Sequence, residues 1–121
     1  MIKMIKNNSN LNLVSYSPEW KKYFEKEVIG LKKLLKNNFI KAHHIGSTSI
    51  TSILAEPTLD ILVEVHTLTG IKSFQIEFGK MGLALNEELD KEDNIHLIRL
   101  SPDNSCDLCH IHIYEKIHHE D

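Results

Sequence analysis

Residues 59–65 constrain the fold more than any other segment, because they form a near-continuous run of aliphatic side chains. Their sequence is Leu-Asp-Ile-Leu-Val-Glu-Val, and such a run is typical of an interior strand that is covered on both faces. The segment therefore predicts a central strand with other elements packed on it. Asp60 interrupts the run at its start, where a carboxylate is costly unless it has a function.

The periodicity on either side of this strand predicts an α+β fold. Apolar residues three or four apart predict a helix that begins at Ser17-Pro18-Glu19 and a second helix that ends at Gly82. A short helix is expected near residues 50–54, and strands are expected at 39–45, 83–85, 95–100 and 108–115. We therefore expect helices packed on one mixed, mostly antiparallel β-sheet. Residues 1–15 form a lead-in segment, 16–115 a single domain, and 116–121 a polar tail.

Composition narrows the classes of partner. The chain has 121 residues with 14 basic and 17 acidic side chains, a net charge of −3. This acidity, with Arg99 as the one arginine, argues against a nucleic-acid partner. No apolar run approaches the roughly 18 residues of a membrane span, so no membrane partner is expected. Two cysteines and the lack of a secretory signal at the start indicate a cytoplasmic protein.

The turn after the expected strand 39–45 has the residues of a phosphate-binding loop. The sequence His44-Ile45-Gly46-Ser47-Thr48-Ser49 leaves backbone N–H groups and hydroxyls at the end of a strand, where they can hold a phosphate. Glycine lets the backbone approach such a ligand closely. A Gly-Ser pair alone is weak evidence, because most such pairs are ordinary turns. Asp60, one short helix and one strand later, favours the functional interpretation.

Two histidines near the end of the chain are candidates for a metal site. His110 and His112 are two apart on a strand and therefore point to one face. They can hold a metal together with Asp60, or bind phosphate when protonated. The alternative is two surface histidines. His44 can join them, whereas His43 is expected to point away and His96 to lie on the surface.

The string Cys106-Asp107-Leu108-Cys109-His110 matches the c-type haem attachment motif. We expect no haem, because there is no export signal and a strand is a poor haem scaffold. A zinc site at Cys106 and Cys109 needs both cysteines at a turn, since they would face opposite sides of a regular strand. Two reduced thiols beside a turn are the favoured interpretation.

Four segments together resemble the GrpB family, which belongs to the nucleotidyltransferase superfamily with its DNA polymerase beta-like fold. They are Tyr16-Ser17-Pro18-Glu19-Trp20, His44-Ile45-Gly46-Ser47-Thr48-Ser49, Glu56-Pro57-Thr58-Leu59-Asp60-Ile61-Leu62-Val63 and His110-Ile111-His112. The resemblance covers about residues 14–115. It implies a nucleotidyltransferase-like fold for nearly the whole chain.

The resemblance also implies roles for individual residues. Gly46, Ser47 and Thr48 would bind the phosphates of a nucleotide, with His44 and Ser49 as additional contacts. Asp60 would be the catalytic carboxylate and would bind Mg²⁺ or Mn²⁺, with His110 and His112 as further metal ligands. The chain departs from the pattern at Thr58, where the superfamily has a second acid. It also resembles a short member without the helical segment that usually follows the His-x-His motif.

Two functions follow from these residues. The first is a GrpB-like protein that binds a nucleotide or another phosphorylated small molecule with a divalent metal and can transfer a nucleotidyl group. The alternative is a non-catalytic protein-interaction module that keeps the fold, with the acidic loop 87–93 as its contact surface. We also expect a homodimer, because a last strand at 108–115 with apolar groups on both faces tends to pair as a sheet edge.

Overall fold

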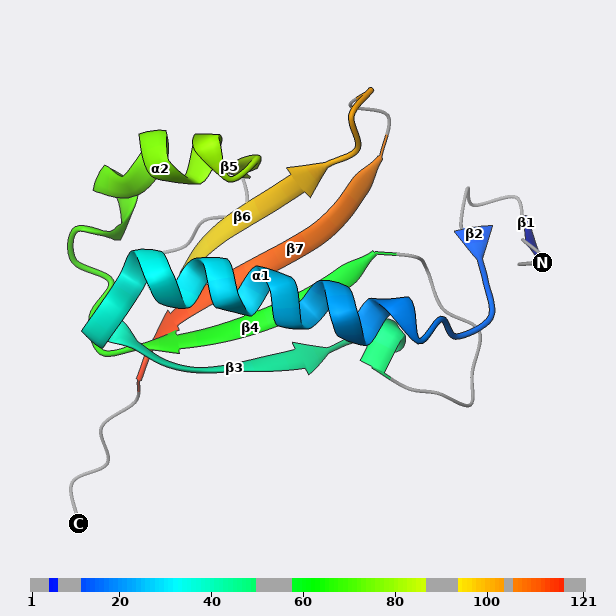
Figure 1. Ribbon diagram of the computed structural model, residues 1–121, viewed down its shortest axis with the longest axis horizontal. Helices are drawn as coiled ribbons and strands as arrows, with labels where there is room; N and C mark the ends of the chain where they lie inside the picture. Colours follow the sequence, from blue (N-terminus) through cyan, green and yellow to red (C-terminus); the bar gives the residue numbers. More distant parts are fainter. Residues whose placement is uncertain (1–4, 7–11, 50–57, 87–93, 104–105, 117–121) are drawn as a thin grey trace, which may run out of the picture.

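The computed structural model describes residues 5–6, 12–49, 58–86, 94–103 and 106–116. Its centre is a five-stranded sheet in the order β3-β4-β7-β6-β5 (Figure 1). The strands are β3 (Phe39–Ile45), β4 (Leu59–Val65), β5 (Leu83–Leu85), β6 (Asn94–Leu100) and β7 (Asp107–Glu115). Only β4 and β7 pair in parallel among these five strands, which confirms the expected mixed, mostly antiparallel sheet.

Helix α1 (Glu19–Leu35) lies across one face of this sheet (Figure 1). Its start follows the sequence signal, because the backbone N–H of Glu19 donates to Ser17 Oγ at 3.3 Å. Trp20, Leu31 and Leu35 are buried against the sheet, and the helix lysines are exposed. The amphipathic stripe in the sequence therefore predicts the packed side of α1 correctly.

Smaller elements complete the described chain. A 3₁₀ turn, η1 (Lys36–Asn38), ends α1, and η2 (Ser47–Ser49) follows β3. The second expected helix forms as η3 (Ile71–Phe74) running into α2 (Gln75–Lys80). In the lead-in segment, β1 (Ile5–Lys6) and β2 (Asn12–Leu13) pair as a separate two-stranded sheet. The expected short helix at 50–54 and the acidic loop 87–93 lie outside the described residues.

The two faces of the main sheet differ in burial. Along β4, Leu59, Ile61, Val63 and Val65 are buried toward α1, and the residues between them are only partly buried. Ile111 and Ile113 of β7 and Leu97 of β6 complete the apolar layer beneath the helices. The expectation that residues 59–65 form an interior strand is confirmed. Its aliphatic run, however, fills one face fully and carries Asp60 and Glu64 on the other.

The last strand does not lie at the sheet edge, so that prediction was wrong. β7 pairs with β4 on one side and with β6 on the other, which makes it the middle strand of the five. β7 lies inside the sheet because it pairs in parallel with β4 as well as with its hairpin partner β6. The sequence did not reveal this, since a parallel neighbour cannot be inferred from hairpin spacing. The expected homodimer therefore loses the edge-pairing reason given for it.

Candidate functional site

The β3–η2 turn and the start of β4 bring Gly46 and Asp60 into contact. Ile45 is the register partner of Asp60, so the turn lies directly beside the carboxylate. Gly46 has a φ of +76°, and a Cβ built there would lie 2.6 Å from Asp60 Oδ2. Glycine is therefore required twice, once for the backbone conformation and once for the space that the carboxylate fills.

The hydroxyls after Gly46 hold the turn itself. Thr48 is fully buried, and its Oγ1 lies 2.7 Å from His44 Nε2. Ser49 Oγ donates to the carbonyl of Gly46 at 2.7 Å. The phosphate-binding roles of Gly46, Ser47 and Thr48 stay predictions, and the Ser47 side chain lies outside the described residues.

His110 and His112 lie on the same face of the sheet as Asp60. His110 is the register partner of Asp60 and His112 that of Leu62 in the parallel β4–β7 pair. On β3, His43 pairs with Leu62, whereas His44 pairs with Ile61 on the α1 side and stacks on Phe24. The β3–β4 register places His43 on the Asp60 face, so the expectation that His43 points away was wrong. His44 still acts on the charge of Asp60, and its part in the site stays a prediction.

His96, which we expected on the surface, is buried and lies on the same face of the sheet as Asp60. Its Nε2 lies 2.7 Å from His110 Nδ1, and its ring is 4.3 Å from the His112 ring between centroids. His110 Nε2 lies 2.9 Å from Asp107 Oδ2. A carboxylate only accepts, so His110 Nε2 donates to Asp107, and in the neutral form of His110 its Nδ1 accepts from His96. His96 lies here because it is the cross-strand partner of His112, a register that the sequence analysis did not predict.

Burial shifts the pKa values of Asp60 and of two histidines near it. Desolvation raises the pKa of Asp60, while His110, His112 and His44 oppose the shift by favouring the carboxylate. Desolvation also lowers the pKa of His112 and of His44, in each case against the attraction of Asp60. Asp60 is therefore a partly desolvated carboxylate, and burial favours the neutral forms of the nearby His112 and His44.

The donor set is incomplete for a metal cage made of protein alone. Among the described side chains, no group of three or more His, Cys, Asp or Glu converges well enough to hold a metal ion. Both ring nitrogens of His110 already have partners. Asp60 and His112 are therefore the better-placed members of the predicted ligand set, and the remaining ligands would have to come from a substrate or water.

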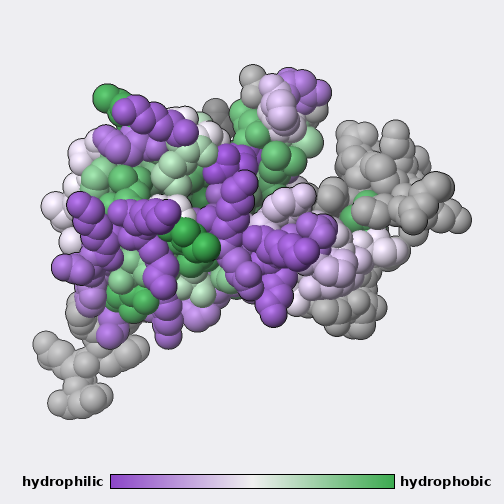
Figure 2. Space-filling model, in the orientation of Figure 1, coloured by the Kyte–Doolittle hydropathy of each residue, from purple (hydrophilic) through white to green (hydrophobic). Residues whose placement is uncertain are grey.

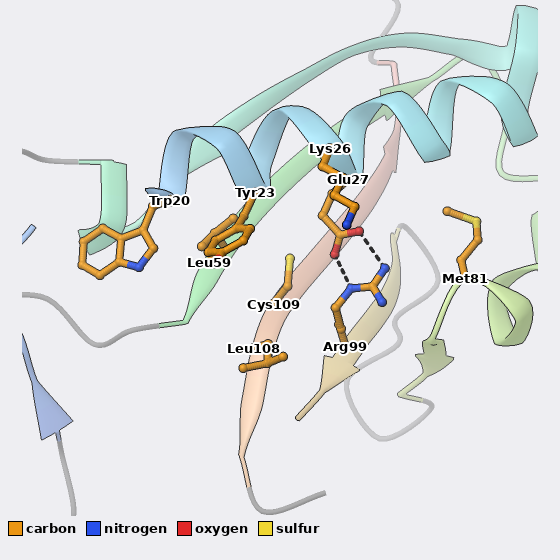
Figure 3. Close-up of a pocket in the computed structure, with 9 residues that line it drawn as sticks. All are labelled: Trp20, Tyr23, Lys26, Glu27, Leu59, Met81, Arg99, Leu108 and Cys109. Atoms are coloured by element: carbon orange, nitrogen blue, oxygen red, sulfur yellow. Dashed lines mark hydrogen bonds and ion pairs between the residues drawn. The ribbon is translucent and has the colours of Figure 1, made fainter. Parts of the chain in front are cut away.

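A separate pocket opens on the opposite face, beneath α1 (Figure 3). Its volume is about 520 Å³. Glu27 of α1 and Arg99 of β6 form a bidentate ion pair in its wall, with N···O distances of 2.6 and 2.7 Å. None of the predicted phosphate or metal residues lines this pocket. Sequence reasoning missed it, although Arg99 was notable as the one arginine of the chain.

The two cysteines have different surroundings and form no disulfide. Cys106 is exposed, whereas Cys109 is buried and lines the pocket beneath α1. Burial and the nearby Glu27 raise the pKa of the Cys109 thiol to about 12. The Cys109 thiol therefore stays protonated in the metal-free protein, and the interpretation of two reduced thiols stays a prediction.

Fold and site together define an α+β protein with helices on a mixed sheet and a Gly–Asp–His cluster at one sheet end. The sequence model of the GrpB protein family matches residues 10–120. The chain belongs to this family. None of the helices that the structure describes is long and apolar enough to span a membrane.

Individual relatives agree with this assignment. The chain is 29% identical over 111 residues to the UPF0157 protein BH1888 of Halalkalibacterium halodurans, covering 91% of this chain and 54% of that protein. It is 32% identical over 97 residues to the glutamate-rich protein GrpB of Alkalihalophilus pseudofirmus, covering 80% of this chain and 50% of that protein. The chain thus spans about half the length of these relatives.

A solved structure is similar as well. The crystal structure of the conserved protein GrpB from Enterococcus faecalis superposes with a TM-score of 0.76 at 34% identity. The match covers 85% of this chain and 61% of that one. The fold expected from the sequence is therefore the fold of a GrpB protein.

Proposed function

We propose that this GrpB-family chain binds a phosphorylated small molecule, of the nucleotide class, at the junction of Gly46 and Asp60. The observation that carries the proposal is the contact between the Asp60 carboxylate and Gly46, with the 2.6 Å distance that leaves no room for a Cβ. A carboxylate held against a Gly-Ser turn at a strand end can share a divalent cation with a phosphate bound at that turn.

The donor chemistry supports a cation that arrives with the substrate. Mg²⁺ is commonly bound by one or two carboxylates, water and substrate phosphates rather than by a cage of protein ligands. Asp60 would supply the carboxylate, and His112 would contact the metal or the phosphate. His110, held by Asp107 and His96, would orient its neighbours. When bound, the cation would neutralise phosphate charge, which is the chemistry that nucleotidyl transfer needs.

Binding without transfer is the second candidate, and Thr58 favours it. By the family resemblance Thr58 stands where the superfamily has a second acid, and its hydroxyl donates to the Asp107 carbonyl at 3.0 Å. The position thus has a structural bond in place of a metal ligand. A single carboxylate favours a module that binds the ligand, or a partner protein, without chemistry. Two reduced cysteines support a cytoplasmic setting for either candidate.

A thermal-shift experiment tests the binding proposal. ATP, GTP, CTP and UTP are each added with Mg²⁺ or Mn²⁺, and the melting temperature is compared with that for nucleotide or metal alone. At least one nucleotide with metal should raise the melting temperature by mass action. Asp60→Asn should remove this rise while leaving the protein as stable as before or more so, because the amide keeps the shape without the buried charge.

Asp103→Asn is the matched control, since Asp103 is exposed in the turn between β6 and β7. It should keep the full nucleotide response. An equal response in Asp60→Asn and the unmodified protein would refute the role of Asp60. For any nucleotide that binds, an assay of pyrophosphate release separates the two candidate functions: release indicates nucleotidyl transfer, and no release indicates binding alone.

A further inference from the structure

The pocket beneath α1 has the size and lining of a small-molecule site. Its volume of about 520 Å³ falls within the roughly 300–1,000 Å³ typical of ligand pockets. It lies between the N-terminal half of α1 and the strand ends of β4, β6 and β7 (Figure 3). Its lining is mainly apolar with a few charged groups: Trp20, Tyr23, Lys26, Glu27, Leu59, Met81, Arg99, Leu108 and Cys109.

The charged groups of the pocket favour an anion. Lys26 and Arg99 carry two positive charges against the single carboxylate of Glu27. The Arg99 guanidinium is fixed on two sides, by both oxygens of Glu27 and by Gly82, where a Cβ would lie 2.6 Å from Nη1. Because Glu27 is already paired with Arg99, the charge of Lys26 is left to attract a ligand.

The apolar groups favour a flat ring. Tyr23 is 54% exposed and Leu108 39% exposed, although both are large apolar side chains and both line the pocket. Trp20, by contrast, is buried and fixed edge-to-face by Tyr16. Figure 2 shows hydrophobic surface gathered above the N-terminal half of α1, where β6 and β7 emerge. Rigid aromatic walls with an uncovered apolar rim suit an aromatic ring better than a flexible chain.

We propose that this pocket binds a small molecule with a flat aromatic ring and one anionic group, and that it is distinct from the Asp60 site. The ring would lie among Trp20, Tyr23 and Leu108, and the anion near Lys26. The two sites are back to back across the sheet. Leu59 and Cys109 line the pocket, and their chain neighbours Asp60 and His110 are register partners on the opposite face.

The dye 1-anilinonaphthalene-8-sulfonate is a suitable probe, since it has aromatic rings and one sulfonate. Trp20 is the one tryptophan of the chain, so energy transfer from tryptophan to the dye shows that the dye is bound to the protein, and the variants described next locate it. The folded protein should bind one dye molecule saturably, with this transfer. Asp60→Asn should leave the dye affinity unchanged, which separates this test from that of the proposed function.

Two matched pairs of variants locate the dye. Leu108→Glu places an acid in the pocket, and Leu100→Glu places one at an equally exposed leucine (40% against 39%) that does not line it. Lys26→Gln removes the pocket cation, and Lys21→Gln removes an exposed lysine of the same helix outside the lining. Leu108→Glu and Lys26→Gln should each weaken dye binding about fivefold, as expected for about 1 kcal/mol of charge interaction.

The controls should bind the dye as the unmodified protein does. Equal affinity within either pair, binding without energy transfer from Trp20, or loss of binding in Asp60→Asn would each overturn the proposal. The melting temperature of every variant is measured alongside. If Leu108→Glu does not fold, the lysine pair still decides, because exposed lysines of a helix surface can be changed at little cost to stability.

Discussion

Gly46 is the residue on which the candidate site depends most directly. Two independent constraints act there, the positive φ of +76° and the close approach of Asp60. Gly70 has a similar φ of +82°, but a Cβ there would meet nothing within 4 Å. The two glycines therefore differ in the second constraint alone, which makes Gly70 a natural control for the contact between Gly46 and Asp60.

Gly46→Ala should therefore destabilise the protein more than Gly70→Ala. The control should cost about 1 kcal/mol, the price of a side chain in the left-handed region. At Gly46 the displaced Asp60 carboxylate adds to that cost, so about 2 kcal/mol or more is expected. Urea denaturation measures both values. Equal costs in the two variants would mean that Asp60 moves aside freely and that its place beside Gly46 is not constrained.

Single residues also show how far the sequence could predict the site. Asp60 stood out because a carboxylate interrupts an aliphatic strand, and the structure does put it beside Gly46. His96 was missed because its environment depends on the β6–β7 register, which opposes it to His112. Register across strands depends on the whole sheet, and a shift of one residue would have placed His96 on the other face.

At the scale of elements, the Glu27–Arg99 pair joins α1 to β6. The two residues are 72 positions apart in the chain, and their side chains are 12% and 29% exposed. Bidentate geometry and partial burial make this pair stronger than a surface ion pair. Lys22 and Glu19 provide the comparison, since they lie 3.6 Å apart with side chains 73% and 56% exposed.

Arg99→Met should cost about 2 kcal/mol of unfolding free energy, because it leaves the Glu27 carboxylate without its partner. Lys22→Met should cost less than about 0.5 kcal/mol. Chemical denaturation of the two variants gives the comparison. The double variant with Glu27→Met should recover part of the loss, since no unpaired charge then remains beneath α1. Similar costs for the two single variants would place Arg99–Glu27 among ordinary surface pairs.

The elements themselves were largely predictable, whereas their order in the sheet was not. Amphipathic periodicity gave α1, and short apolar runs bounded by turns gave the strands, because these signals are local. The placement of β7 between β4 and β6 is a non-local choice. For the same reason, the pocket beneath α1 could not be inferred, since its lining comes from residues 20 to 109.

On the scale of the whole molecule, the candidate site and the pocket share one end of the sheet but lie on opposite faces. The start of β4 supplies Leu59 to the pocket and Asp60 to the other face, and the start of β7 does the same with Cys109 and His110. The charge of Asp60 on one face also helps to raise the pKa of the Cys109 thiol on the other. The two sites therefore take residues from the same two strand ends but face opposite sides of the sheet.

The protonation of Asp60 and of the histidines near it makes the stability of the whole molecule depend on pH. His44 and His112 have pKa values below 6.5 in the folded protein, because burial disfavours their charged forms. The unfolded chain then binds more protons than the folded one as the pH falls through 6.5, so stability declines until the pH is below the lowered pKa values. Asp60 acts oppositely. Its raised pKa adds stability as the pH falls through that value toward 3.8.

Burial is the main cause of the lowered pKa of His112, and the groups that face the ring adjust the size of the effect. Asp60 on β4 raises the pKa of His112, and His110, which lies on β7 with His112, lowers it. The His96 ring of β6 lies 4.3 Å from the His112 ring between centroids. His112→Gln should therefore reduce the loss of unfolding free energy between about pH 8 and about pH 5.5. His66→Gln, at an exposed position after β4, should leave the loss unchanged. Urea denaturation at both pH values measures it, and an undiminished loss in His112→Gln would show that His112 titrates in the folded protein as it does in the unfolded chain.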